Sequence, residues 1–97
     1  MLFEWDKHKR AASLSKHHID FEDAKHIFEG PVFESVQHRG GEDRTLAIGR
    51  LEGIEIVVVY TVRGNRRRII SARRAHRSER QDYANQLEHA QEREDGF

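Results

Sequence analysis

The hydrophobic pattern in the second half of the chain is that of β-strands. Apolar, mostly β-branched residues fill the run from Ile54 to Val62 almost without interruption, which predicts a central strand covered on both faces over part of its length. Less regular strand patterns flank this run, at Val32–His38, Arg44–Leu51 and Arg66–Ala72. Turn signals separate the segments, at Gly40-Gly41, Glu52-Gly53 and Gly64-Asn65. The four strands are therefore expected to form an antiparallel meander.

The first third of the chain predicts a short strand followed by two helices. Apolar and polar residues alternate over Phe3–Trp5, as in a strand with one buried face. Asp6 is a suitable N-cap for a helix over Lys7–Lys16. Asp20 would cap a second, shorter helix, which Gly30-Pro31 ends. The apolar face of this second helix would consist of Phe21, Ala24 and Phe28.

In the last third, the apolar spacing lengthens from that of a strand to that of a helix. A helix is expected from about His76, with one face formed by Tyr83, Leu87 and Ala90, and residues 92–97 are expected to be frayed. The element order is then β-α-α-β-β-β-β-α. We therefore predict an α+β fold, a mainly antiparallel sheet with helices packed on it, in one domain over residues 1–91.

Composition narrows the classes of function. The chain has 97 residues and no cysteine, so disulfides and thiolate metal sites are excluded. No segment approaches the roughly 20 apolar residues of a membrane span, and no secretory signal is visible, so we expect a cytoplasmic protein. The seven histidines show no metal-ligand spacing, and there is neither a nucleotide-binding glycine motif nor a serine-nucleophile elbow. We therefore expect no metal and no cofactor.

Charge is balanced over the whole chain but not along it. Basic (Lys+Arg) and acidic residues both number 17, yet Arg63–Arg80 contains eight arginines and a single acidic residue, Glu79. Arginine binds phosphate through two parallel hydrogen bonds and keeps its charge when partly buried. The segment therefore points to phosphate or nucleic-acid binding. The alternative is a solvated basic face, or one that pairs with an acidic partner.

The same segment supplies the groups that RNA cleavage requires. Attack of a 2′-OH on the adjacent phosphate needs a base, a stabiliser of negative charge and an acid. The candidates for stabilising the charge are Arg63, Arg68 and Arg73, with Arg77 in support. The candidates for proton transfer are His76 and Glu79, and further RNA contacts are expected from Arg66, Arg67, Arg74 and Arg80. As alternatives, Glu79 is a carboxylate favoured at a helix N-terminus and Tyr83 is a core residue.

Strand alternation predicts which of these side chains share a face of the sheet. In the returning strand, one face would carry Arg66, Arg68, Ile70 and Ala72, and the other Arg67, Ile69, Ser71 and Arg73. In the strand before it, one face would carry Ile54, Ile56, Val58 and Tyr60, and the other Val57, Val59, Thr61 and Arg63. Arg68 and Arg73 are thus expected on opposite faces.

Three blocks of the sequence resemble the BrnT toxins. The first comprises Phe3–Asp6, Lys9, Lys16-His17, Asp20–Ala24, Phe28 and Pro31. The middle block comprises Glu42–Arg44 and Ile48-Gly49, and the last comprises Val58–Arg63, Arg68–Arg73, Glu79-Arg80 and Tyr83. Two positions depart from the family pattern, because Ser13 stands where members often have Asn and His18 where they often have Gly. A glycine at that second position would suit a left-handed residue that closes the first helix.

The resemblance implies a RelE-like fold and a ribonuclease toxin of a bacterial type II toxin–antitoxin pair. It also implies silencing by BrnA, a ribbon-helix-helix antitoxin, in a complex that represses its own operon; a 2:2 heterotetramer built on the antitoxin dimer is expected. On this basis we predict a metal-independent endoribonuclease. The alternative is a non-enzymatic module that only binds the antitoxin or nucleic acid, because arginines serve binding and catalysis alike.

Overall fold

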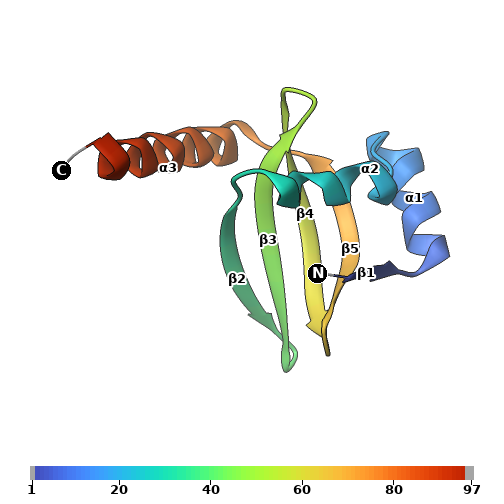
Figure 1. The fold of residues 1–97 in the computed structure, drawn as a ribbon. Coiled ribbons are helices and arrows are strands. Elements are labelled where there is room, and N and C mark those ends of the chain that lie inside the picture. Colours follow the sequence, from blue (N-terminus) through green and yellow to red (C-terminus); the bar gives the residue numbers. More distant parts are fainter. Residues whose placement is uncertain (1, 96–97) are drawn as a thin grey trace.

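The computed structural model describes the backbone of residues 2–95 and the side chains of residues 2–90. A five-stranded sheet forms its centre, in the order β1-β5-β4-β3-β2 (Figure 1). The strands are β1 Leu2–Trp5, β2 Phe33–Arg39, β3 Glu42–Leu51, β4 Ile54–Arg63 and β5 Arg66–Arg74. The helices are α1 Lys7–His17, α2 Phe21–Ala24, the 3₁₀ helix η1 Lys25–Glu29 and α3 Arg77–Asp95.

The predicted fold class is confirmed. Strands β2 to β5 form an antiparallel meander, and β1 adds the one parallel pair, against β5. The run predicted as the central strand is β4, which lies in the middle of the sheet. Helix α3 continues to Asp95, inside the stretch predicted to be frayed, and residues 96–97 lie outside the described part of the chain.

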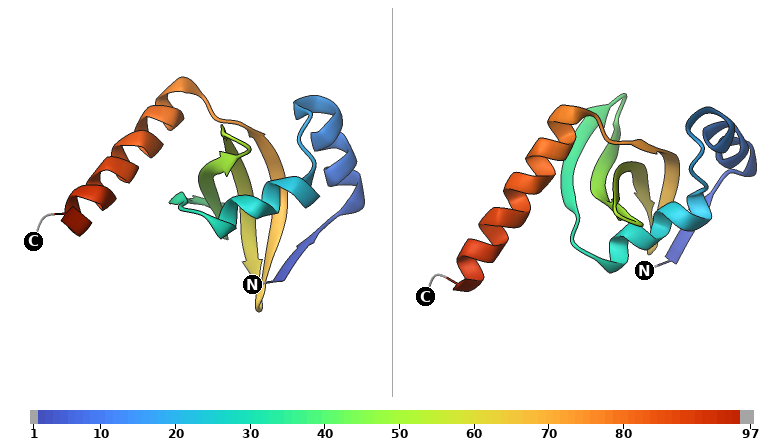
Figure 2. Two further views of the ribbon diagram at one scale, coloured as in Figure 1. Left: turned by 45° about the horizontal axis from the view of Figure 1, so that its top comes forward. Right: turned by 90° about the horizontal axis from the view of Figure 1, so that it is seen from above.

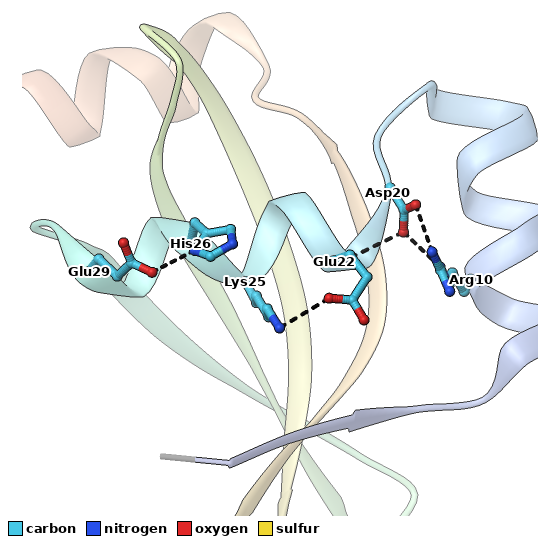
Figure 3. Close-up of polar contacts among 6 residues, drawn as sticks. All are labelled: Arg10, Asp20, Glu22, Lys25, His26 and Glu29. Atoms are coloured by element: carbon cyan, nitrogen blue, oxygen red, sulfur yellow. Dashed lines mark hydrogen bonds and ion pairs between the residues drawn. The ribbon is translucent and has the colours of Figure 1, made fainter.

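Both aspartates predicted as N-caps perform that role. The Asp6 carboxylate accepts hydrogen bonds from the backbone N–H groups of His8 and Lys9, at 2.7 and 3.2 Å, and Asp20 accepts from the N–H of Glu22 at 3.1 Å. Asp20 also binds the Arg10 guanidinium through two bonds of 2.7 and 2.9 Å, which ties the start of α2 to α1 (Figure 3). These Arg10 bonds hold the pKa of the Asp20 carboxyl below its ordinary value.

One face of the sheet is covered by α2 and η1, which cross it in sequence (Figures 1 and 2). Phe21, Ala24 and Ile27 from these helices are buried. They form a core with residues of the sheet, including Ala47, Ile56, Val58, Tyr60, Ile69 and Ala72. Gly49 permits the close approach of η1, because a Cβ there would lie 2.8 Å from Cβ of Ile27. We call this side of the sheet the covered face.

The opposite side carries Val57, Val59 and Thr61 of β4, and we call it the open face. Tyr83 and Leu87 of α3 pack near Val57 at one end of it. From there α3 projects away from the sheet past β2 (Figures 1 and 2). Within the described part of the chain, no helix is long and apolar enough to cross a membrane.

Candidate functional site

A β-bulge in β5 determines which of its side chains share a face. Val59 pairs with Ser71, whereas the next residue of β4, Tyr60, pairs with Ile69. Ile70 is therefore an extra residue with no counterpart on β4. Because successive side chains of a strand point to opposite sides, one extra residue reverses the assignment of faces for everything beyond it.

The bulge brings Arg68 and Arg73 to the same face. Arg68 pairs with Thr61 and Arg73 pairs with Val57, and both partners belong to the open face. The prediction from simple alternation, which placed the two arginines on opposite faces, is therefore wrong. They are separated by about 13 Å, the length of four strand residues.

A polar row crosses the open face near the β4–β5 hairpin. Thr61 pairs with Arg68 on β5, and its hydroxyl donates a 3.0 Å hydrogen bond to the carbonyl of Asp43 on β3, the residue before Arg44. The Arg68 guanidinium donates a 2.6 Å hydrogen bond to Glu4 of β1. The Nε of Arg44 is buried and, within the described residues, makes no hydrogen bond. The row thus contains two arginines that each face a carboxylate, Arg68 with Glu4 at 2.6 Å and Arg44 with Glu42 at 4.0 Å.

At the other end of the open face, Arg73 is bound to the first turn of α3. Its guanidinium donates two hydrogen bonds to the Glu79 carboxylate, at 2.8 and 2.9 Å. Glu79 also accepts a 2.7 Å hydrogen bond from the backbone N–H of His76, as in the capping box of a helix N-terminus. The Arg73 bonds lower the pKa of the Glu79 carboxyl. Glu79 is therefore ionised at neutral pH, and His76 is exposed beside it.

These positions split the predicted site into two parts. Arg63 pairs with Arg66 at the hairpin end of the sheet. It is about 20 Å from the level of Arg73, since it lies six positions along β4 from Val57, the partner of Arg73. Arg63 and Arg73 therefore lie at opposite ends of the open face, too far apart to contact one phosphate. Arg66 lies beside Arg63, while His76, Arg77 and Glu79 lie with Arg73 at the start of α3.

The other predicted RNA contacts have different surroundings. The Arg67 guanidinium lies against three aromatic rings of the covered face, 4.2 Å from the centroid of Phe28, 5.3 Å from Tyr60 and 5.9 Å from Phe3. Arg74 pairs with Ile56, a residue of the covered face. Arg80 donates a hydrogen bond of 2.9 Å to the carbonyl of Ala75. The structure therefore places Arg67 and Arg74 on the covered face, and Arg80 at the start of α3.

A groove that the sequence did not predict runs between α1 and β5. Its volume is about 240 Å³, and its lining residues are Lys9, Ala12, Ser13, Lys16, His17, Ile70 and Ser71. Burial lowers the pKa of the His17 imidazole, and the nearby cations Lys16 and Arg73 lower it further. His17 is therefore neutral at pH 7. The sequence feature that could have indicated this groove is in the segment of α1, which contains no acidic residue and has Lys9 and Lys16 seven residues apart.

The arrangement suits chemistry on a phosphate diester. Arg73 supplies positive charge on the open face, and the imidazole of His17 lines the adjoining groove with Ser71 of β5. Arg44 and Arg68 offer a second cationic position on the same face. In the part of the chain whose side chains are described, no group of three or more His, Cys, Asp or Glu is placed to hold a metal ion.

Comparison with known proteins decides the family. A family model described as the ribonuclease toxin BrnT of a type II toxin–antitoxin system matches residues 5–79. The chain belongs to the BrnT toxin family. It is also similar to the crystal structure of the ribonuclease toxin BrnT of Brucella abortus, with a TM-score of 0.62 and 30% sequence identity over 79% of this chain and 100% of that one. A search of curated proteins finds no match.

Membership makes the chain a ribonuclease toxin of a type II toxin–antitoxin system. The BrnT match includes the covered face, the polar row and the Arg73–Glu79 ion pair, and it ends at the third residue of α3. Most of the projecting helix therefore lies beyond the part that the BrnT family model describes.

Proposed function

We propose that the chain cleaves RNA at the Arg73 end of its open face, through attack of the 2′-OH and without a metal ion. The observation that carries this proposal is the position of the Arg73 guanidinium, which Glu79 holds at the end of the open face through hydrogen bonds of 2.8 and 2.9 Å, with His17 lining the adjoining groove, in a BrnT toxin. A guanidinium stabilises the negative charge that develops on the phosphate. A neutral imidazole accepts the proton of the attacking hydroxyl.

The remaining groups have supporting roles in this proposal. His76 returns a proton to the leaving oxygen, and Arg77 adds positive charge at the start of α3. Glu79 positions Arg73. Arg44 and Arg68 bind a neighbouring phosphate on the same face, and Arg63 and Arg66 contact the RNA backbone beyond it at the hairpin. RNA thus follows the length of the open face.

Two variants distinguish a catalytic role of Arg73 from a structural one. Arg73→Ala and Glu79→Gln both break the ion pair, but only the first removes the cation. We expect Arg73→Ala to lower the rate of RNA cleavage in EDTA by about 10²- to 10³-fold, and Glu79→Gln to retain most activity. Lys7→Ala, an exposed cation on α1, is the control. Equal loss in the two ion-pair variants would assign Arg73 a structural role alone.

We propose that the neutralising partner is a BrnA-like ribbon-helix-helix antitoxin in a 2:2 heterotetramer. The cationic groups of the open face would then be covered by an acidic or amphipathic segment of that antitoxin. The complex would bind operator DNA through the antitoxin and repress its own operon in the cytoplasm. Light scattering on the co-purified pair tests the stoichiometry, and a 1:1 heterodimer that persists at high concentration would contradict it.

A second candidate is a non-enzymatic antitoxin-binding module. It is favoured by the existing ion pairs, since Arg73 is bound to Glu79 and Arg68 to Glu4. Induced expression distinguishes the two functions. Growth arrest that the antitoxin relieves supports the ribonuclease, whereas a stable complex without arrest supports the binding module.

A further inference from the structure

We propose that the α1–β5 groove is a binding track for the RNA backbone that leads to the Arg73 end of the open face. This inference rests on the proposed function, because it specifies how the same site receives its substrate. The groove contains two exposed lysines, Lys9 and Lys16, and the hydroxyl of Ser71. None of its lining residues is acidic. A polyanion would therefore meet only cations and neutral groups there.

The two lysines have the geometry of a track. They lie seven residues apart in one helix, and hence on one side of it, with about 10.5 Å of helix between them. This separation is large enough for the two lysines to bind different phosphates of one strand, since the charges of a strand lie about 3.4 Å apart along the axis even in a stacked duplex. Neither lysine has an ion-pair partner among the residues with described side chains, whereas Arg10 of the same helix is bound to Asp20.

The groove is continuous with the open face. Ser71 lines the groove and also pairs with Val59, between the levels of Arg68 and Arg73. His17 also lines the groove, and the positive charge of Arg73 contributes to lowering the pKa of its imidazole. A strand held by Lys9 and Lys16 would therefore pass directly to the groups that we assign to the reaction.

The lining favours RNA over a segment of the antitoxin. An amphipathic helix docks through a row of apolar anchors, and the groove offers only Ala12 and Ile70 as apolar side chains. Phosphate groups bind to ammonium and hydroxyl groups, and the groove supplies both through its two lysines and Ser71. Binding of an acidic protein segment is the competing outcome of the experiment.

The test measures RNA binding without cleavage. A fluorescent single-stranded RNA with 2′-O-methyl riboses cannot react through its 2′-OH, and its affinity is measured at several salt concentrations. Each lost phosphate contact should reduce the slope of log K against log salt by about 0.7. We expect a reduction of about 0.7 for Lys9→Ala and for Lys16→Ala, and of about 1.4 for the double variant.

Lys7→Ala is the matched control, since it removes the same charge from the same helix. Lys7 is two residues from Lys9 and so points to a different side of α1; its slope should equal that of the wild type. Three outcomes would each contradict the proposed RNA track. They are unchanged slopes in the groove variants, no RNA binding by the wild type, and groove variants that bind the antitoxin more weakly but RNA as well as the wild type does. Cleavage of unmodified RNA by the wild type is measured separately, so it tests the proposed function independently.

Discussion

Glu79 joins the last strand of the sheet to the helix that follows it, because its carboxylate binds Arg73 of β5 through both oxygens while accepting the N–H of His76. The side chains of Arg73 and Glu79 are only 22% and 20% exposed. Their hydrogen bonds are therefore shielded from water, and they hold the first turn of α3 against the end of β5. Helix α3 otherwise rests on the sheet through Tyr83 and Leu87.

This ion pair should stabilise the fold measurably. Hydrogen bonds between charged groups contribute about 1.5–3 kcal/mol each in net terms, so we expect Glu79→Gln to reduce the free energy of unfolding by about 2 kcal/mol. Urea denaturation of wild type, Glu79→Gln, Arg73→Ala and the double variant gives the coupling energy. A coupling energy near zero would show that the pair adds nothing to stability.

The contribution of Glu79 should depend on pH in one direction. Its pKa is lowered in the folded chain, so the stabilisation is fully present above the unfolded pKa of about 4.3 and disappears as the pH falls through the folded pKa. The difference in stability between wild type and Glu79→Gln should therefore be constant from pH 7 to about 5 and shrink below that. A difference that persists unchanged at pH 2 would contradict this.

Replacing His18 by glycine should stabilise the chain. His18 ends α1 in the left-handed conformation, with φ of 61°, which costs an L-residue about 1–2 kcal/mol. Glycine avoids that penalty but loses more entropy on folding, by about 0.4–1 kcal/mol. We expect a net gain of about 0.5–1 kcal/mol in thermal or urea denaturation. His18→Ala keeps the Cβ and should show no gain; an equal gain in both variants would assign the effect to the imidazole.

Gly49→Ala should have the opposite effect. A Cβ at this position would lie 2.8 Å from Cβ of Ile27 and 3.2 Å from Cγ1 of Val32, so η1 would have to move away from the sheet. Such overpacking costs about 1–3 kcal/mol. Gly30→Ala is the control, because its new Cβ meets nothing closer than 4.0 Å. If urea denaturation finds both variants as stable as the wild type, η1 is not tightly packed there.

The main elements could be predicted because their signals are local. The apolar run Ile54–Val62, the two capping aspartates and the glycine turns each indicate a structure within a few residues of themselves. The bulge gave no such signal, since the adjacent apolar residues Ile69 and Ile70 also fit a strand buried on both sides. Because the extra residue of the bulge was not detected, the prediction placed Arg68 and Arg73 on opposite faces of the sheet.

The groove could not be predicted for a different reason. Its two walls are far apart in sequence; Ser13 of α1, for example, contacts a residue of β5 59 positions later. Neither wall alone distinguishes a binding surface from a solvated basic helix. Sequence spacing likewise suggested that Arg63 and Arg73 could act together, although a straight strand places its two ends far apart.

Ser13 also occupies one stretch of the sheet's edge. Its hydroxyl donates to the carbonyl of Ala72 and accepts from the N–H of Ala72, at 3.2 and 3.3 Å, so β5 has no free hydrogen-bonding groups at that point beyond the end of β1. The opposite edge is β2, whose residues from Glu34 to Arg39 are exposed. An additional strand from another molecule would find unpaired backbone groups along β2. The two outermost strands of the sheet are β1 and β2, with four and seven residues, so β2 offers the longer edge for strand addition.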